Sequence, residues 1–277
     1  MNRVKQVIRK FLARNLFFLI DSFYKFYFHF TKINDPLIII LTPGKVGSSS
    51  VYKTLIKKFK SVFHIHNFTK KSIERSILKN KKSNRGYAPL HLIKSKHLLS
   101  LVKKNNPKIY LICLIREPIS REISSIYQNI EMFENTTLND FLKINNDKVA
   151  SNLTKLLLRD QYLKELDDWF DEQLFEHFGV DIFKLNLDEG YDIQIFENVS
   201  FLLIRMEDLK SHFSEAISEF LPFSNDKIEL IKDNIASTKF YNLDYVKLKQ
   251  KIDVNKFKVC DHYVNNKFVN HFYKNEI

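Results

Sequence analysis

The residues best suited to chemistry lie in one short segment rich in glycine and serine, Thr42-Pro43-Gly44-Lys45-Val46-Gly47-Ser48-Ser49-Ser50. Glycine is scarce in this chain, with 5 among 277 residues, yet Gly44 and Gly47 stand close together. A strand that feeds a glycine-containing loop and then a helix presents backbone N–H groups and the positive end of the helix dipole to an anion. The segment therefore predicts a cradle for a phosphate or phosphosulfate group, with Lys45 as a point charge and the serines as donors.

This loop differs from a Walker A loop, in which the lysine follows the second glycine. Here Lys45 precedes Gly47. The alternative to an anion cradle is an ordinary strand–turn–helix connection whose helix begins with serines.

A second candidate anion site follows the apolar run at residues 109–115, in the segment Arg116-Glu117-Pro118-Ile119-Ser120-Arg121-Glu122-Ile123-Ser124. Arg116 stands at the expected carboxyl end of a strand, which is where open α/β sheets bind ligands. Ser124 follows within the next helix, and two helical turns can bring its hydroxyl back towards the strand end. A guanidinium fork with a hydroxyl suits a phosphate monoester. The alternative is a surface ion pair between Arg116 and Glu117 or Glu122.

Apolar runs predict the strands that must position these residues, at 37–41, 61–66, 109–115 and 199–205. Helical patterns follow at 48–59, 118–131 and 138–178, with Gly179 as the expected cap of the last, and helix-like segments continue to the end. Strands that alternate with helices indicate an α/β fold with a mainly parallel sheet. In the absence of repeats and Ser/Gly linkers, we expect one domain over residues 35–277 and an extension over residues 1–34.

The composition narrows the class of protein further. The formal net charge is +12, which favours an anionic partner, and 44% of residues are hydrophobic, which is too many for a disordered chain. The two cysteines, Cys113 and Cys260, cannot build a disulfide framework, and no Cys/His spacing suits a metal. We therefore expect a cytoplasmic protein with no metal and no bound nucleic acid.

Residues 1–32 combine helical apolar spacing with seven basic residues and a single acid, Asp21. Asp21 and Lys25 interrupt the apolar run that a membrane-spanning helix needs, and the cleavage site of a signal peptide is missing. The segment predicts a basic amphipathic helix that lies on an anionic membrane surface, which would place the protein at the inner face of the membrane. The alternative is a terminal helix docked on the body of the protein.

Together, the two candidate anion sites resemble those of the P-loop sulfotransferase superfamily. The segment Gly44–Ser50 looks like the family's K-x-G-[ST]-[ST] loop, which cradles the 5′-phosphosulfate of PAPS (3′-phosphoadenosine 5′-phosphosulfate). Arg116 and Ser124 match, at the family's spacing, the pair that holds the 3′-phosphate. Met206–Leu209 resembles the family's E-D-L strand end. The resemblance implies a single three-layer P-loop-type α/β domain with PAPS as the cofactor.

Three segments are similar to bacterial capsular polysaccharide synthesis proteins: Gly44–Tyr52, Trp169–Leu174 and Gly179–Phe183. The resemblance as a whole covers residues 37–275. The chain also departs from the superfamily. Ser50 stands where cytosolic members often carry a tryptophan against adenine, and no Arg-Lys-Gly segment is found near the C-terminus. The adenine contacts therefore remain unassigned.

The resemblance implies a sulfotransferase that moves a sulfuryl group from PAPS to a hydroxyl or amine of a surface or capsular glycan, or of its precursor. Lys45 is expected to stabilise the leaving phosphate oxygen, and a general base to take the acceptor proton. His91 is the first candidate for this base, because it precedes Arg116 at about the family's distance for a catalytic His-Leu. His66 is the second candidate and a carboxylate the third. His97 is interpreted as a solvated helix residue.

Two other functions stay open. One is a phosphotransferase that uses a nucleoside triphosphate on the same loop, for which Asp208 would have to hold Mg²⁺. The other is a non-catalytic basic protein that binds glycan or membrane. A cluster of acids could suggest glycosidic chemistry, but we interpret it as the solvated face of a helix: Asp167, Asp168, Asp171 and Glu172.

Overall fold

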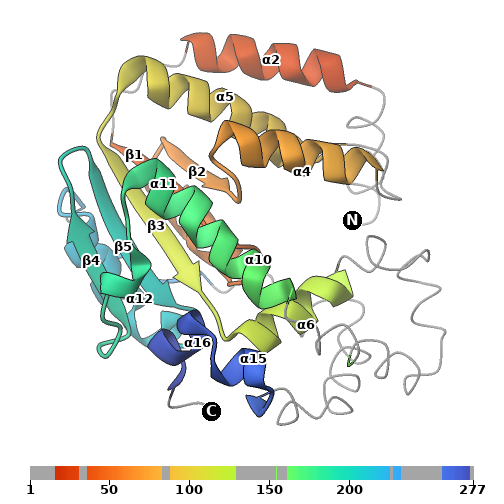
Figure 1. Ribbon diagram of the computed structural model, residues 1–277. Helices are drawn as coiled ribbons and strands as arrows, with labels where there is room; N and C mark the ends of the chain where they lie inside the picture. Colours follow the sequence, from red (N-terminus) through yellow and green to blue (C-terminus); the bar gives the residue numbers. More distant parts are fainter. Residues whose placement is uncertain are drawn as a thin grey trace.

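The computed structural model describes residues 16–30, 36–82, 88–128, 154, 161–224, 227–231 and 258–274. Its centre is a sheet with the strand order β2-β1-β3-β5-β4 (Figure 1). The strands are β1 (Leu37–Leu41), β2 (Val62–Ile65), β3 (Ile109–Ile115), β4 (Tyr191–Ile195) and β5 (Val199–Arg205). All strands are parallel except β4, which pairs antiparallel with β5 at the edge. The predicted α/β fold with a mainly parallel sheet is confirmed.

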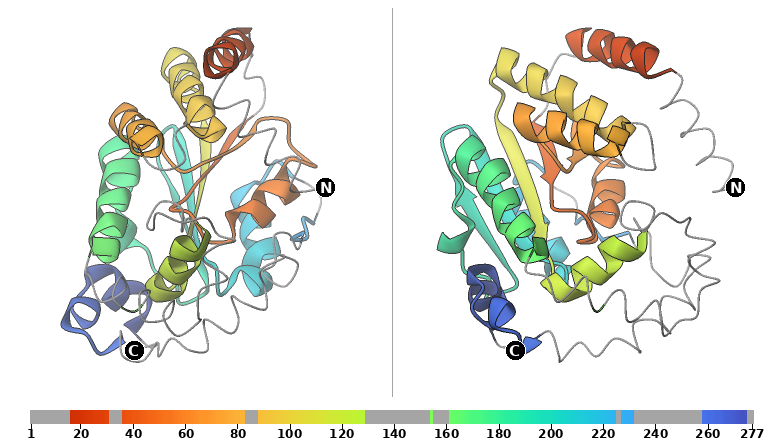
Figure 2. Two further views of the ribbon diagram at one scale, coloured as in Figure 1. Left: turned by 90° about the vertical axis from the view of Figure 1, so that its right-hand side faces the viewer. Right: turned by 45° about the vertical axis from the view of Figure 1, so that its right-hand side comes forward.

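Helices cover both faces of this sheet and make three layers, as the edge-on view in Figure 2 shows. On one face lie α2 (Phe17–Phe30), α4 (Lys70–Lys82), α5 (Leu90–Asn105), α6 (Pro118–Gln128), α10 (Gln161–Phe170), α15 (Asp261–Val264) and α16 (Lys267–Phe272). On the other lie α3 (Ser48–Leu55) and α12 (Leu209–Phe220). Because both faces are covered, the runs of β1 and β3 are apolar throughout, and every residue of β1 is fully buried.

The edge strand β4 was not among the predicted strands. Its sequence, Tyr-Asp-Ile-Gln-Ile, alternates polar and apolar residues over only 5 positions, and most of its side chains are half-buried. An edge strand with one neighbour needs no continuous apolar run. The apolar pattern that reveals buried parallel strands is therefore weak here.

Several predicted boundaries change in the structure. The helix expected at 48–59 ends at Leu55 and continues as turns, and the strand expected at 61–66 covers only Val62–Ile65. The long helix expected at 138–178 is described from Gln161 onwards, and its earlier part, apart from residue 154, lies outside the described residues. Of the helix-like segments expected after β5, residues 232–257 also lie outside them.

This long helix is interrupted by a π-helical turn, η1 (Asp171–Phe175), before the short helix α11 (Glu176–Phe178). Gly179 ends it with φ 70°, and its N–H donates to the carbonyl of Phe175 at 2.9 Å. The predicted glycine cap is confirmed. A 3-10 turn, η2 (Ile182–Lys184), then leads to β4.

The N-terminal helix α2 packs on α5. Its Asp21 lies 2.8 Å from Nε2 of His97 and accepts a hydrogen bond from Lys96 at 3.1 Å, while Phe28 is buried beside His97. His97 is therefore buried, and its interpretation as a solvated residue was wrong, because α2 covers it. The first 15 residues of the predicted amphipathic segment lie outside the described part of the chain. Among the described helices, none is long and apolar enough to cross a membrane.

The strand order creates one special position in the sheet. The chain passes from β1 to β2 on one side, and then crosses back so that β3 pairs with β1 on the other side. Open α/β sheets bind ligands at such a switch point, outside the carboxyl ends of the strands. Here the switch point lies between the loops that follow β1 and β3.

Candidate anion-binding site

The loop between β1 and α3 folds tightly at this switch point. Lys45 and Gly47 both have left-handed backbone conformations, with φ 72° and 78°. Between them, Val46 inserts its fully buried side chain into the core, so that only its backbone can contact a ligand. Gly47 is the N-cap of α3.

The amide groups at the start of α3 differ from those inside the helix in their hydrogen bonding. Within the described part of the chain, the N–H groups of Val46, Gly47, Ser48 and Ser49 donate to no acceptor. The first N–H groups of a helix have no partner inside the helix and carry its positive dipole end. They are therefore suited to bind an anion.

The two glycines of the loop have different surroundings. A Cβ atom on Gly44 would meet no heavy atom within 4 Å, whereas one on Gly47 would lie 3.4 Å from Cγ of Met206. Gly47 thus packs against the chain just beyond β5, while Gly44 borders open space. At the end of β1, the buried hydroxyl of Thr42 has no hydrogen-bond partner among the described residues.

Arg116 brings the second predicted segment to this loop. It follows β3, is half-buried, and its Nη1 donates to the carbonyl of Lys45 at 3.1 Å. Within the described residues Arg116 has no ion pair with a carboxylate, because Glu122 pairs with Arg121 and Glu117 has other partners. The alternative of a surface ion pair was wrong, and the guanidinium lies at the switch point.

Glu117 closes the N-terminus of α6 instead. Its carboxylate accepts hydrogen bonds from the amides of Ile119 at 2.8 Å and Ser120 at 2.7 Å, and from the hydroxyl of Tyr263 at 2.8 Å. The start of α6 is therefore satisfied, unlike that of α3. Ser124 lies half-buried on α6, and among the described residues no contact joins it to Arg116 or to the loop.

The three serines of the loop are not equivalent. The hydroxyl of Ser48 is buried and lies 2.8 Å from Nε2 of His64 on β2. Ser49 and Ser50 are half-buried, and the carbonyl of Ser50 accepts a hydrogen bond from the hydroxyl of Thr54 at 2.8 Å. The hydroxyl of Ser48 therefore holds β2 to α3, a role that its position in the loop did not predict.

Three histidines form a chain beside the loop. The ring centroids of His64 and His66 are 4.9 Å apart, and those of His66 and His91 are 5.7 Å apart, each pair nearly perpendicular. His91 is exposed at the start of α5. The structure thus brings both predicted base candidates, His66 and His91, to the same side of the loop.

The hydrogen bond of His66 decides which nitrogen carries its proton. Nδ1 lies 2.8 Å from the carbonyl oxygen of Thr42, which can only accept, so Nδ1 is protonated and Nε2 keeps a lone pair. Burial lowers the pKa of His66; the bond to Thr42 opposes this, and the charge of Lys45 adds to it. Burial, together with His66, His91 and Lys94, also lowers the pKa of His64 to about 3. Both rings are neutral at pH 7.

Two side chains of the segment formed by α10 and η1 hold the chain around His66 in place. Nε1 of Trp169 donates to the carbonyl of His66 at 2.8 Å. In the π-helical turn, the buried side-chain oxygen of Gln173 accepts from the amide of Phe68 at 2.6 Å and from that of Thr69 at 3.3 Å. The chain just after β2 is thereby fixed, although neither contact was predicted from the sequence.

The acids of this helix divide into two groups. Asp168 and Asp171 are exposed, as predicted. Glu172 is buried and pairs with Arg75 of α4, so its interpretation as part of a solvated face was wrong. The π-helical turn shifts the side-chain directions at this point, which the regular helical spacing of the sequence does not reveal.

The end of β5 completes the surroundings of the site. Arg205 forms an ion pair with Asp208, and the carboxylate of Glu207 accepts from the amide of Glu117 at 3.1 Å. In the described residues, His, Cys, Asp and Glu side chains form no group of three or more that could hold a metal ion.

The chain is therefore an α/β protein with a mainly parallel sheet, and the loop at its switch point has backbone amides suited to an anion. A family model described as Putative capsular polysaccharide synthesis protein matches residues 141–274. The match includes Trp169 and β5 but not the β1–α3 loop or Arg116. Neither the curated proteins nor the solved structures contain a match to the chain. The similarity to capsule synthesis proteins therefore concerns the part of the chain that supports the site.

Proposed function

We propose that this protein is a sulfotransferase that moves a sulfuryl group from PAPS to a hydroxyl or amine of a surface or capsular glycan, or of its precursor. One observation carries the proposal. The open amides of the β1–α3 loop and the guanidinium of Arg116 converge at the switch point of the sheet, where Arg116 donates to Lys45 at 3.1 Å. Two cationic groups and a set of free amides suit a ligand with two separate anionic groups.

The residues divide between the two anionic ends of PAPS. The loop Gly44–Ser50 and Lys45 would hold the 5′-phosphosulfate, and Arg116 with Ser124 the 3′-phosphate. Open space beside Gly44 and unpaired amides from Val46 to Ser49 fit such a group. Val46 and Ser48 would contribute their amides alone, since their side chains are engaged elsewhere.

The transfer needs a base and a cation. When bound, PAPS supplies a sulfuryl group whose sulfur forms a bond to the acceptor oxygen or nitrogen while its bond to the phosphate oxygen breaks. Nε2 of His66 takes the proton that the acceptor loses, and Lys45 stabilises the charge left on the phosphate. His66 is favoured over His91 because its tautomer is set by Thr42 and its lowered pKa leaves Nε2 unprotonated at neutral pH.

The glycan acceptor is supported by the similarity of residues 141–274 to capsular polysaccharide synthesis proteins. The positive charge of the chain, +12, also suits an acidic glycan. Both observations concern the class of acceptor alone. The sugar and the position that accept the group follow from neither.

Calorimetric titration with 3′,5′-ADP (PAP), ADP, and ATP with Mg²⁺ tests the cofactor. We expect PAP to bind at least about tenfold more tightly than ADP, because only PAP offers a 3′-phosphate to Arg116. Transfer of label from ³⁵S-labelled PAPS to capsular glycan then tests the reaction.

The same titration separates the alternatives. Preference for ATP with Mg²⁺ would support a phosphotransferase, although the candidate Mg²⁺ ligand for that reaction, Asp208, is paired with Arg205. Failure to bind any of the three nucleotides would support a non-catalytic basic protein. Either result would contradict the proposed sulfotransferase.

A further inference from the structure

Helix α2 carries a large apolar surface that the described protein leaves uncovered. Its outward side chains have exposed fractions from 48% to 78%. They are Phe18, Leu19, Phe23, Phe26, Tyr27 and Phe30; we call this set the aromatic face. Single exposed apolar residues are ordinary, but a large contiguous patch of exposed apolar side chains marks a site of interaction.

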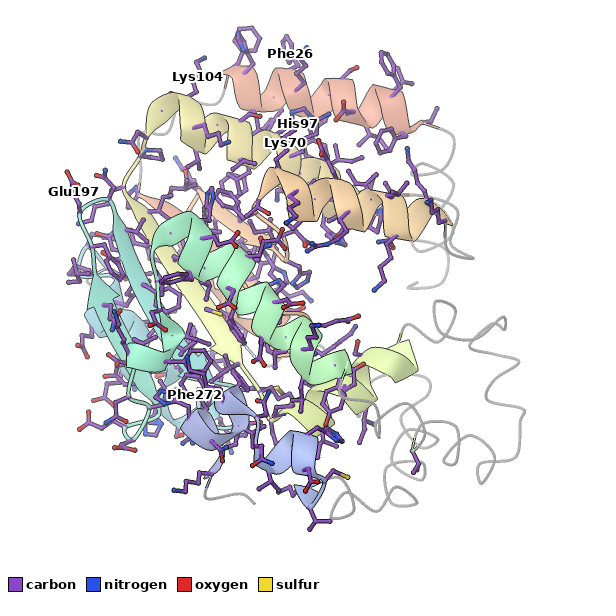
Figure 3. The ribbon with its side chains drawn as sticks, in the orientation of Figure 1. Phe26, Lys70, His97, Lys104, Glu197 and Phe272 are labelled. Atoms are coloured by element: carbon purple, nitrogen blue, oxygen red, sulfur yellow. The ribbon has the colours of Figure 1, made fainter. Side chains whose placement is uncertain are left out.

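The opposite side of α2 fixes which way this face points. Asp21 binds His97 and Lys96 of α5, and Phe28 packs between Phe63 and His97 with 4% of its surface exposed. In Figure 3, His97 lies between α2 and α5, while Phe26 points away from the body of the protein. The aromatic face therefore cannot rotate inward without breaking the contacts of Asp21 and Phe28.

The spacing of the aromatic face is that of a helix lying flat on a surface. With about 100° per residue, Leu19, Phe23, Phe26, Tyr27 and Phe30 fall within an arc of about 100°. The acid of α2, Asp21, is on the docked side, and the side chain of Lys25 is exposed. Aromatic side chains of this kind are favoured at the boundary between lipid headgroups and acyl chains.

The charge of the chain decides which occupant fits. Residues 1–15, directly before α2, carry five basic residues and no acid. Pairing two copies of the chain would bring together two molecules that each carry a net charge of +12. An anionic lipid surface instead attracts the positive charge of each basic residue near it.

We propose that the aromatic face of α2 docks the protein on an anionic membrane surface, with the aromatic side chains in the interface and the basic N-terminal residues against the headgroups. This inference is independent of the proposed sulfotransferase activity. It concerns a separate surface for membrane binding, which lies on the side of α5 opposite the sheet.

Sedimentation of the full-length chain with vesicles tests the proposal. Vesicles of phosphatidylcholine alone are compared with vesicles that also contain phosphatidylglycerol. We expect binding to the anionic vesicles alone, weakened by salt. The double variant Phe23→Ser/Phe26→Ser should bind at least about tenfold more weakly, because it removes two side chains from the interface.

A matched control replaces two exposed apolar residues elsewhere. Phe175→Ser/Ile195→Ser changes side chains that are 54% and 77% exposed on η1 and β4, and should bind vesicles as the wild type does. Lys25→Glu leaves the aromatic face intact and should weaken binding to the anionic vesicles alone.

Three outcomes would overturn the proposal. The first is equal binding to neutral and anionic vesicles, and the second is unchanged binding of the Phe23→Ser/Phe26→Ser variant. The third is a dimer in analytical ultracentrifugation that this variant dissociates, without vesicle binding by the wild type. In that case the aromatic face is a contact between two copies.

Discussion

Lys45 combines a positive charge with a left-handed backbone, φ 72°. For a residue with a side chain this conformation costs about 1 kcal/mol or more, and such strain persists where the surroundings hold it. The carbonyl of Lys45 accepts the hydrogen bond from Arg116, so the strained backbone itself links the two candidate anion sites. A substitution can therefore remove the charge of Lys45 without disturbing the backbone conformation at this position.

Replacement of Lys45 by glycine removes the charge and relieves the backbone. We expect Lys45→Gly to keep its free energy of unfolding within about 1 kcal/mol of the wild type. Sulfuryl transfer should fall by about 10²-fold or more, because the leaving oxygen loses its cation. Chemical denaturation and the labelled-PAPS assay measure the two effects.

Asn106→Gly is the matched control. Asn106 also has a positive φ, 41°, but ends α5 and lies outside the loop. This variant should transfer the sulfuryl group at the wild-type rate. Near wild-type turnover of Lys45→Gly would remove Lys45 from the mechanism.

Arg116 is expected to recognise the 3′-phosphate alone. Arg116→Ala removes a charge-assisted contact of roughly 1.5–3 kcal/mol, which corresponds to about 10- to 100-fold weaker PAP binding. Adenosine 5′-phosphosulfate lacks the 3′-phosphate, so its affinity should hardly change. Calorimetry of both ligands tests this difference.

The control uses another arginine at a strand end. Arg205 follows β5 and is held by Asp208, so Arg205→Ala should leave the ratio of the two affinities unchanged. If Arg116→Ala weakens both ligands equally, Arg116 shapes the loop through Lys45 and does not bind the 3′-phosphate.

His66 and His91 can be told apart by their pH dependence. His66→Gln should bind PAP normally and lose about 10²- to 10⁴-fold in rate. Because burial lowers the pKa of His66, the wild-type rate should rise with pH below the ordinary histidine range and be level at pH 7. His66→Gln should lose this rise, and His91→Gln should keep it.

His97→Gln separates a structural effect from a catalytic one. His97 is buried against Asp21, away from the loop, so this variant should lower stability and keep the rise of the rate with pH. If His91→Gln loses the rise and His66→Gln keeps it, the base is His91. A rise that survives both substitutions favours a carboxylate base.

Among the elements beside the switch point, helices α3 and α6 differ in whether the first amides of the helix have hydrogen-bond acceptors. The start of α6 is closed by Glu117, whereas the first amides of α3 have no acceptor in the described chain. Gly47 produces this difference, because its left-handed conformation turns the loop into α3 without a side chain over the amides.

Gly47→Ala should lower the free energy of unfolding by about 1 kcal/mol, since alanine is disfavoured at φ 78°. Its Cβ would lie at an ordinary contact distance, 3.4 Å, from Met206, so the cost comes from the backbone. A shifted loop should weaken PAP binding by about tenfold or more. Thermal unfolding and calorimetry measure these effects.

Gly179→Ala is the control for Gly47→Ala, because both substitutions place alanine at a similar positive φ. Gly179 has φ 70°, and a Cβ atom added to it would meet no heavy atom within 4 Å. It ends α11, far along the chain from the loop. This variant should lose similar stability and bind PAP normally. Equal PAP affinity of both variants would mean that the loop conformation does not control anion binding.

At the scale of the whole molecule, the buried histidines make folding sensitive to acid. In the folded protein the pKa of His64 is about 3, against 6.5 for an unperturbed histidine. Between these values the unfolded chain binds a proton that the folded protein does not, so stability falls as pH decreases from about 6.5. His66 acts in the same direction.

His64→Gln should make stability less dependent on pH in this window, by up to about 1.4 kcal/mol per pH unit. Urea denaturation at a series of pH values measures the slope. At pH 8 this side chain is uncharged in both the wild type and the variant, so the difference in stability there reports the changed packing and the changed hydrogen bond to Ser48. An unchanged slope would mean that other groups control acid unfolding.

The sequence by itself determined the strands that lie inside the sheet and the loop that follows the first of them. Leu37–Leu41 and Ile109–Ile115 are covered on both faces, so burial requires an apolar side chain at every position. Gly47 and Gly179 are equally local signals, because glycine adopts a positive φ without steric cost. Such features need no knowledge of distant neighbours.

Only the tertiary structure decided what these residues contact. The bond from Arg116 to Lys45, that from Ser48 to His64 and that from Trp169 to His66 join residues 71, 16 and 103 positions apart. Sequence spacing sets which residues share a helix face or a strand end, but not which elements pack together. The outward direction of the aromatic face was decided in the same way, by the docking of Asp21 on α5.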